Sequence, residues 1–318
     1  MALNEKIDDA PVLITDKDQL FLLAYHFIQS LDLKESSKQT YRRELKPFIQ
    51  WVIKTKIKQP TRNNILEYKL SLEQQELSPL TISSYIVAVR RFFEWMESEK
   101  IYPNVARGIK GMKRNRGFRK DPLTLKQIKK LLEGMEKESI RGKRDFAIIN
   151  LLVRTGLRTI EVVRSNIGDI RQESGESVLW IQGKGRDIKD EFVLLTEETL
   201  KPIQDYLKKR NKKRIKENEP LFGSLSDRNY GKRMTTRSIS RIVKNNLRSI
   251  GIDHMRLTAH SLRHTAITLA LQGGASIQEA QALGRHANIN TTMIYAHNIS
   301  RVSNAPERKI DELLKNES

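Results

Sequence analysis

The chain has 318 residues, which is long enough for two domains, and it contains no apolar run near the roughly 20 residues that span a bilayer. The sequence has no cysteine, which excludes a disulfide scaffold and a thiolate metal site. The 58 Lys and Arg residues exceed the 38 Asp and Glu residues, and this net charge of +20, spread along the chain, favours nucleic acid as the partner over a membrane surface or a purely solubilising role.

The N-terminal third of the chain predicts a bundle of helices. The first residues lack the basic and apolar regions of a secretion signal, so we expect a cytoplasmic protein. From residue 17 to residue 106, apolar residues recur at helical spacing in successive segments, with start signals at Ser36, Thr61 and Ser78-Pro79. Four helices with short connections form a small bundle.

A strongly basic segment with several glycines, residues 108–122, follows this bundle. It has no apolar periodicity and ends at Pro122. We therefore expect an interdomain linker, which either lies along a phosphate backbone or is simply solvated.

After Pro122 the pattern becomes that of a mostly helical domain with a small sheet. Residues 123–135 predict a capped helix, and Gly156 interrupts a later helical pattern. Residues 177–195 predict two antiparallel strands, joined by a turn at Gly183-Lys184-Gly185. Helices return after residue 195. The fold class expected for the whole chain is mainly α, in two domains, with one small antiparallel sheet.

Six cationic, imidazole or phenolic residues stand at structural boundaries of this second domain. They are Arg158, Lys184, His260, Arg263, His286 and Tyr295. Taken singly, each has an ordinary explanation, such as a helix cap, a solvated turn or half-buried packing. Taken together, they match the needs of phosphoryl transfer, which requires donors placed where negative charge develops.

The chemistry that suits these residues needs no metal. Arg158 and Arg263 can hold the non-bridging oxygens of a phosphodiester, and the spacing His260-x-x-Arg263 puts both side chains on one helical face. The phenol of Tyr295, with an ordinary pKa of about 10, becomes a nucleophile if neighbouring cations make its phenolate accessible. Lys184, on a hairpin, can give the departing 5′ oxygen a proton.

Four segments carry a resemblance to a known family. They are TGLRTIE at 155–161, IQGKGRDIKDEFVLL at 181–195, HSLRHT at 260–265 and GRHANINTTMIYAH at 284–297. In these motifs, in their order and in the nine-residue step from His286 to Tyr295, the chain resembles the tyrosine site-specific recombinases of the lambda-integrase and Xer family. The helical region 17–106 is similar to the N-terminal core-binding, SAM-like domain of that family.

The resemblance implies a role for each of the six residues. Two arginines and two imidazoles would bind the scissile phosphate, a lysine would act from the hairpin, and a tyrosine would form a 3′-phosphotyrosyl link to DNA. In that order, these residues are Arg158, Arg263, His260, His286, Lys184 and Tyr295.

Neighbouring residues have other expected roles. Glu161 corresponds to a supporting acid, whose expected task is to hold local geometry by hydrogen bonds. His264 and His297 are expected to be structural. The sequence departs from the family at Arg285, where many relatives have the glycine of a Leu-Gly-His motif. Either a phosphate contact or a surface position is open for this arginine.

The resemblance also implies a division of the chain and an activity. The division is a core-binding DNA-binding domain at 17–107, a basic linker at 108–122, a catalytic domain at 123–300 and a tail helix for subunit exchange at 301–318. The implied enzyme cleaves and rejoins double-stranded DNA at paired half-sites through a Holliday junction, as a homotetramer and without metal, ATP or cofactor. It would serve DNA integration, excision or dimer resolution. The alternatives are a DNA-relaxing enzyme like the type IB topoisomerases and a non-catalytic DNA-binding protein.

The tail carries a one-sided apolar stripe of Ile310, Leu313 and Leu314, after start signals at Asn304 and Pro306. A helix of roughly ten residues is marginal alone in water, so the stripe needs a groove. It either folds back on its own domain or, as the resemblance implies, binds a neighbouring protomer.

Overall fold

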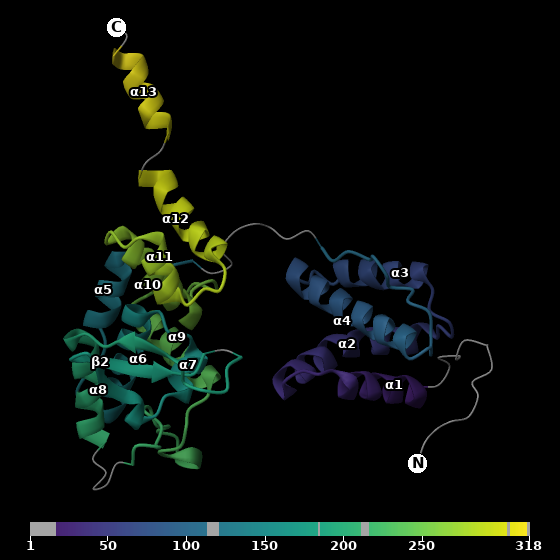
Figure 1. The fold of residues 1–318 in the computed structure, drawn as a ribbon, viewed down its shortest axis with the longest axis horizontal. Helices are drawn as coiled ribbons and strands as arrows, with labels where there is room; N and C mark the ends of the chain where they lie inside the picture. The colour runs from purple at the N-terminus through teal and green to yellow at the C-terminus, as the bar shows by residue number, and fades with distance from the viewer. Residues whose placement is uncertain (1–16, 113–120, 184, 211–215, 304–305, 317–318) are drawn as a thin grey trace. The chain divides into compact units, whose positions relative to one another are not determined.

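The chain folds into helices and one small sheet. The computed structural model describes residues 17–112, 121–183, 185–210, 216–303 and 306–316. The chain divides into two compact units, Met1–Arg116 and Gly117–Ser318 (Figure 1). The expected class, mainly α with a small antiparallel sheet, is confirmed. Within the described ranges no helix is long and apolar enough to cross a membrane.

The described part of the N-terminal unit is a helical bundle. Its helices are α1 (Lys17–Ser30), α2 (Glu35–Thr55), α3 (Arg62–Glu73) and α4 (Pro79–Ser98). Their apolar stripes meet in a core rich in aromatic rings, and Phe27, Phe48 and Phe92 are at most 1% exposed. Phe27 and Phe92 meet edge to face, with ring centroids 5.5 Å apart. Apolar burial therefore holds this unit together.

Two of the three expected helix starts in this unit are confirmed. The hydroxyls of Thr61 and Ser78 accept hydrogen bonds from backbone N–H groups in the first turns of α3 and α4. The expected start at Ser36 is wrong, because α2 begins at Glu35 and Lys34 is its N-cap residue, without a side-chain cap. An acidic residue in the first turn favours this earlier start through the helix dipole.

The segment after α4 stays packed on the N-terminal unit. Ile109 is buried in its core, and the hydroxyl of Ser83 donates to the carbonyl of Met112 at 3.3 Å. Leu123, by contrast, is buried in the core of the C-terminal unit. Of the linker expected at 108–122, residues 113–120 lie outside the described residues.

The C-terminal unit is built around α6. The helices that precede the C-terminal motifs are α5 (Leu125–Glu133), α6 (Ile140–Thr155), α7 (Thr159–Arg164), α8 (Glu197–Arg210), α9 (Thr236–Ser249) and the 3-10 helices η1 (Ile167–Asp169) and η2 (Asp227–Asn229). Ile148, Leu151 and Leu152 of α6 are completely buried, and α6 packs extensively against α8. Because α6 is held in this core, the position of its C-terminal end is fixed.

The small sheet has three antiparallel strands in the order β1-β2-β3. They are β1 (Ile170–Glu173), β2 (Glu176–Ile181) and β3 (Glu191–Leu194). Two strands were expected, and β1 escaped prediction because its sequence, IRQE, has a single apolar residue and no alternation. Residues 182–190 connect β2 to β3, so the connection is longer than the expected turn at 183–185. Lys184 lies outside the described residues.

The last helices carry the C-terminal motifs. They are α10 (Ala259–Gln272), α11 (Ile277–Gly284), α12 (Ile289–Ser303) and α13 (Pro306–Asn316). Helix α10 packs against α6, and α11 and α12 pack against α10 and against each other (Figure 1). On α13, the side chains of Ile310, Leu313 and Leu314 are 55%, 68% and 66% exposed.

Candidate active site

The turn between α6 and α7 positions the first predicted arginine. Gly156 follows the last residue of α6 in the left-handed conformation, with φ of +61°, which glycine adopts without steric cost. Arg158 is then the N-cap residue of α7. Its backbone N–H donates to the carboxylate of Glu161 at 2.7 Å, so this acid caps the helix on which it lies.

Glu161 is completely buried and links two arginines. Its Oε1 accepts from Nη1 of Arg158 at 2.8 Å, and its Oε2 accepts from Nη2 of Arg285 at 3.1 Å. The backbone N–H of Arg158 also donates to Oε2. A carboxylate in a dry interior is tolerated only with such partners.

Arg263, on α10, ties the end of α6 to the end of α11. The residue is 2% exposed. Its Nη1 donates to the carbonyl of Gly156 at 2.6 Å, and its Nη2 donates to the carbonyl of Gly284. Burial lowers the pKa of Arg263 to about 10, and the charges of Arg158 and Arg285 act in the same direction. The guanidinium remains charged at neutral pH. The nearby charges of Arg158 and Arg285 make this part of the unit attractive to an anion.

Helix α11 ends at a close backbone approach. A Cβ on Gly284 would lie 2.9 Å from Cε1 of His286, so the imidazole packs directly on the glycine backbone. Arg285, the next residue, is in the left-handed conformation, with φ of +45° and ψ of +50°. This conformation costs a residue that carries a Cβ about 1–2 kcal/mol.

The side chain of Arg285 is buried, which excludes the surface position that the sequence left open. It is 8% exposed. Its Nη1 donates to the carbonyl of Leu283 at 3.0 Å, and its Nη2 donates to the carbonyl of Gly156 at 3.1 Å as well as to Glu161. Three guanidinium groups thus converge on the ends of α6 and α11.

Tyr295 lies on α12 among imidazole rings and is 3% exposed. Its hydroxyl is hydrogen-bonded to Nδ1 of His264. The ring of His286 stacks on the phenol with centroids 6.0 Å apart, and Nδ1 of His286 is hydrogen-bonded to the hydroxyl of Thr292 at 2.9 Å. The phenol and the two imidazoles therefore form one packed group.

The expectation that neighbouring cations make the phenolate accessible is wrong for this structure. Burial raises the pKa of Tyr295 to about 12, although the charge of Arg263 acts to lower it. Desolvation penalises a phenolate that has no water around it, and here this penalty outweighs the cation. Tyr295 is a neutral phenol at neutral pH.

The two imidazoles beside Tyr295 are also neutral. Burial lowers the pKa of His264 to about 4, with further lowering by His260 and Arg263. Burial likewise lowers the pKa of His286 to about 4, and Arg263 and Arg158 add to this shift. At neutral pH both rings are therefore unprotonated and each has a nitrogen that can accept a proton.

The other predicted residues lie around this group or outside the description. His260 is exposed at the start of α10, with its ring 4.6 Å from that of His264. His297 is exposed on α12. Lys184 falls outside the described residues, while the carbonyl of the neighbouring Gly183 accepts from Arg164 at 3.1 Å.

Sequence reasoning did not assign two of the contacting residues to the site. His264 was expected to be only structural, yet it holds the hydroxyl of Tyr295. Thr292, to which the sequence assigned no role, holds His286. Helical spacing carried the signal in both cases, because His264 is one turn from His260 and Thr292 is one turn before Tyr295.

The described residues contain no cluster of three or more His, Cys, Asp or Glu side chains that would hold a metal.

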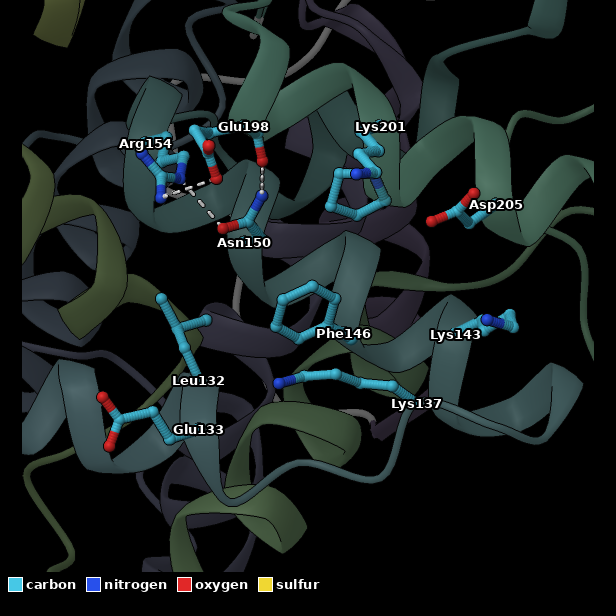
Figure 2. Close-up of a pocket in the computed structure, with 11 residues that line it drawn as sticks. Leu132, Glu133, Lys137, Lys143, Phe146, Asn150, Arg154, Glu198, Lys201 and Asp205 are labelled. Carbon is cyan, nitrogen blue, oxygen red and sulfur yellow. Dashed lines mark hydrogen bonds and ion pairs between the residues drawn. The ribbon is translucent and has the colours of Figure 1, made fainter.

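A separate cavity lies between α5, α6 and α8, with Phe146 on its wall (Figure 2). There Asn150 accepts from Arg154 at 3.0 Å and donates to the Glu198 carbonyl at 2.7 Å. Neither Tyr295 nor the arginines and imidazoles grouped around it line this cavity.

Two family descriptions match the chain. Residues 122–301 match the phage integrase family, and residues 20–102 match the phage integrase N-terminal SAM-like domain. The tyrosine recombinase XerC of Caldanaerobacter subterraneus is 39% identical over 179 residues, which cover 55% of this chain and 46% of that relative. The tyrosine recombinase XerD of Listeria monocytogenes is 29% identical over 279 residues, which cover 86% of this chain and 91% of the relative.

Solved structures share the fold. The XerH site-specific recombinase bound to its difH substrate in a pre-cleavage complex has a TM-score of 0.73 at 20% identity, covering 93% of this chain and 98% of that one. A lambda integrase dimer bound to a COC′ core site has a TM-score of 0.66 at 16% identity, covering 87% of this chain and 94% of that one.

The fold and the buried arginine, imidazole and phenol group agree with a class of enzymes that act on DNA phosphodiesters. The chain belongs to the phage integrase family of tyrosine recombinases, which confirms the resemblance drawn from its four motifs.

Proposed function

We propose that this protein is a site-specific DNA recombinase that cuts and rejoins strands through Tyr295. The observation that carries the proposal is a phenol packed with two neutral imidazoles, under the electrostatic influence of the buried guanidinium of Arg263. Such a group offers a nucleophile, proton acceptors and donors for phosphate charge in one place.

In this proposal Arg158 and Arg263 hold the non-bridging oxygens of the scissile phosphate. Arg158 is 28% exposed, so its guanidinium is accessible to a ligand. Arg263 is buried, but its bonds to the Gly156 and Gly284 carbonyls hold it rigidly. His260 and His286 complete the phosphate site. Donors that are held in place before charge develops stabilise a phosphoryl transition state most strongly.

The chemical step exchanges one phosphoester bond for another. The Tyr295 oxygen attacks phosphorus, and the bond from phosphorus to the 5′ oxygen breaks. The phenol proton passes to the imidazole of His264, which is already hydrogen-bonded to the hydroxyl and whose low pKa rises when the anionic phosphate binds nearby. Lys184, assigned from the sequence, gives a proton to the 5′ oxygen. A 3′-phosphotyrosyl link and a free 5′ hydroxyl result, and attack by another 5′ hydroxyl reverses the step without ATP.

A nicked DNA duplex that loses its 5′ product after cleavage tests the nucleophile. The wild-type protein should form a covalent, detergent-resistant complex with this DNA, and Tyr295→Phe should form none. The matched control is Tyr68→Phe in the N-terminal unit, because the buried Tyr68 hydroxyl has no hydrogen-bond partner within the described part of the chain. Covalent capture by Tyr295→Phe would contradict the assignment.

We further propose that the enzyme works on paired DNA half-sites as a homotetramer, with tails exchanged between subunits. The support is the exposed apolar stripe of Ile310, Leu313 and Leu314 on α13. Removing residues 305–318 should spare binding to a single half-site but weaken cooperative binding to paired sites and strand exchange. Unchanged cooperativity and recombination would contradict tail exchange, and relaxation of supercoiled DNA without recombinant products would indicate a topoisomerase-like activity instead.

A further inference from the structure

Arg285 is a buried cation whose place in the site has no explanation in the roles proposed so far. Its side chain is 8% exposed and donates to the carbonyls of Leu283 and Gly156 and to the carboxylate of Glu161. Its Nε is buried and has no hydrogen-bond partner among the described residues. A buried guanidinium with an unsatisfied donor is a poor choice for stability alone.

The backbone conformation of Arg285 also indicates that stability alone does not explain this residue. The residue is the C-cap that follows α11, in the left-handed conformation with φ of +45°, where a glycine would be unstrained. Strained conformations persist where the surrounding structure holds them, at functional sites and also at helix ends such as Lys56 after α2. The chain therefore keeps an arginine here against both the backbone preference and the desolvation of its charge.

The contacts of Glu161 indicate what the guanidinium does. An arginine fork commonly binds both oxygens of a carboxylate. In this structure Arg285 and the backbone N–H of Arg158 both occupy Oε2, at 3.1 Å and 2.7 Å. The guanidinium of Arg158 is left with Oε1 alone, through Nη1 at 2.8 Å. Its Nη2 makes a longer contact, 3.3 Å, with the carbonyl of Arg285 itself.

We propose that Arg285 is a positioning residue, which shares the Glu161 carboxylate with Arg158 so that each guanidinium binds one carboxylate oxygen. By occupying Oε2, it prevents Arg158 from closing both arms on the acid and keeps N–H groups of Arg158 available to a phosphate oxygen. Its backbone carbonyl orients the second arm of the same guanidinium. The inference rests on the proposed function, in which Arg158 binds the scissile phosphate.

The test compares variants in single-turnover cleavage of the nicked DNA, with DNA affinity measured separately. Arg285→Gly removes the guanidinium and relieves the left-handed strain, so the protein should remain folded. Arg158 should then pair fully with Glu161. Cleavage should slow on the order of 10- to 100-fold, the cost of a slightly misplaced catalytic group. Affinity for the DNA should change much less, because the other phosphate contacts remain.

The decisive variant is Arg285→Gly combined with Glu161→Gln. A neutral amide holds Arg158 less tightly than a carboxylate, so the double variant should cleave faster than Arg285→Gly alone, even though Glu161→Gln slows the wild-type background.

Arg285→Lys should fall between wild type and Arg285→Gly, because an ammonium keeps the charge but lacks the planar fork. The control Arg210→Ala removes a guanidinium that is 4% exposed and bonded to Glu219 and Pro220, outside the site. It should lower thermal stability without slowing cleavage by the folded protein.

Three other outcomes overturn the inference. Wild-type cleavage by Arg285→Gly would show that the guanidinium does not act in the reaction. A double variant no faster than Arg285→Gly would show that Arg285 does not act through Glu161. A loss of affinity that matches the loss of rate would make Arg285 a direct phosphate ligand. Failure of the wild-type protein to capture DNA covalently would instead contradict the proposed function itself.

Discussion

The N-terminal core and the arginine group of the C-terminal unit are both buried, but by different physics. In the first, aromatic rings such as Phe27, Phe48 and Phe92 leave water and meet edge to face. In the second, Arg263, Arg285 and Glu161 are buried with their charges, and a shared carboxylate compensates only part of the desolvation. The first region gains stability from what it buries, whereas the second buries charge at a cost in stability, as its proposed role in binding a phosphate requires.

The largest effect should follow from replacing charge in the arginine group by apolar volume. Arg263→Met should slow covalent capture of DNA on the order of 10²- to 10³-fold, as loss of a preplaced donor does. Its free energy of unfolding should fall by only about 1–3 kcal/mol, because the Gly156 and Gly284 carbonyls lose a donor while the desolvation of a buried charge is avoided. Single-turnover cleavage and urea unfolding of the same sample measure both quantities. A large loss of stability would mean that Arg263 is chiefly structural.

The opposite result is expected in the N-terminal core. Phe92→Ala should lower the free energy of unfolding by about 3–5 kcal/mol, because a large cavity replaces the ring. Cleavage per folded molecule, at saturating protein and low temperature, should stay close to wild type. If Phe92→Ala were well folded and yet unable to cleave, the separation between a stabilising region and a reactive region would be wrong.

A smaller effect should come from the close approach at the end of α11. Gly284→Ala places a methyl group 2.9 Å from the Cε1 position of His286, so the imidazole must move. Cleavage should slow by about tenfold, since displacement of a reactive group is costly even over short distances. The control is Gly223→Ala, whose added Cβ would meet its nearest neighbours at 3.4 Å. Equal cleavage by the two variants would show that His286 need not pack on the backbone.

The smallest effect concerns pH. An unfolded chain protonates histidine near its ordinary pKa of about 6.5, whereas burial lowers the pKa of His264 to about 4. Between these values the unfolded state binds more protons, so stability is complete above the higher value and falls as pH drops toward the lower one. Urea midpoints from pH 7 to pH 4.5 should decline less in His264→Gln than in wild type, while His26→Gln, at an exposed position, should match wild type. An equal decline in all three proteins would contradict a buried, neutral His264.

Much of the fold follows from residues close together in the sequence. Thr61 and Ser78 begin helices because their hydroxyls cap backbone groups within the next turn, and apolar periodicity places the buried faces. Where local signals are weak, prediction failed. The strand β1 has no alternation, and Ser36 lies inside a helix that begins earlier at an acidic residue. The four motifs identified the family because short, chemically specific segments in a fixed order can be recognised without knowing how they pack.

The state of the candidate site was decided by tertiary structure alone. The identity and the order of the cations, imidazoles and phenol follow directly from the sequence. It did not determine that the Tyr295 phenol is neutral or that Arg285 is buried, because both depend on groups from distant segments and on the exclusion of water. Arg263 reaches the carbonyl of Gly156 across 107 residues of chain, and Arg285 reaches Glu161 across 124. Desolvation and charge sharing are properties of that three-dimensional assembly, so no local pattern encodes them.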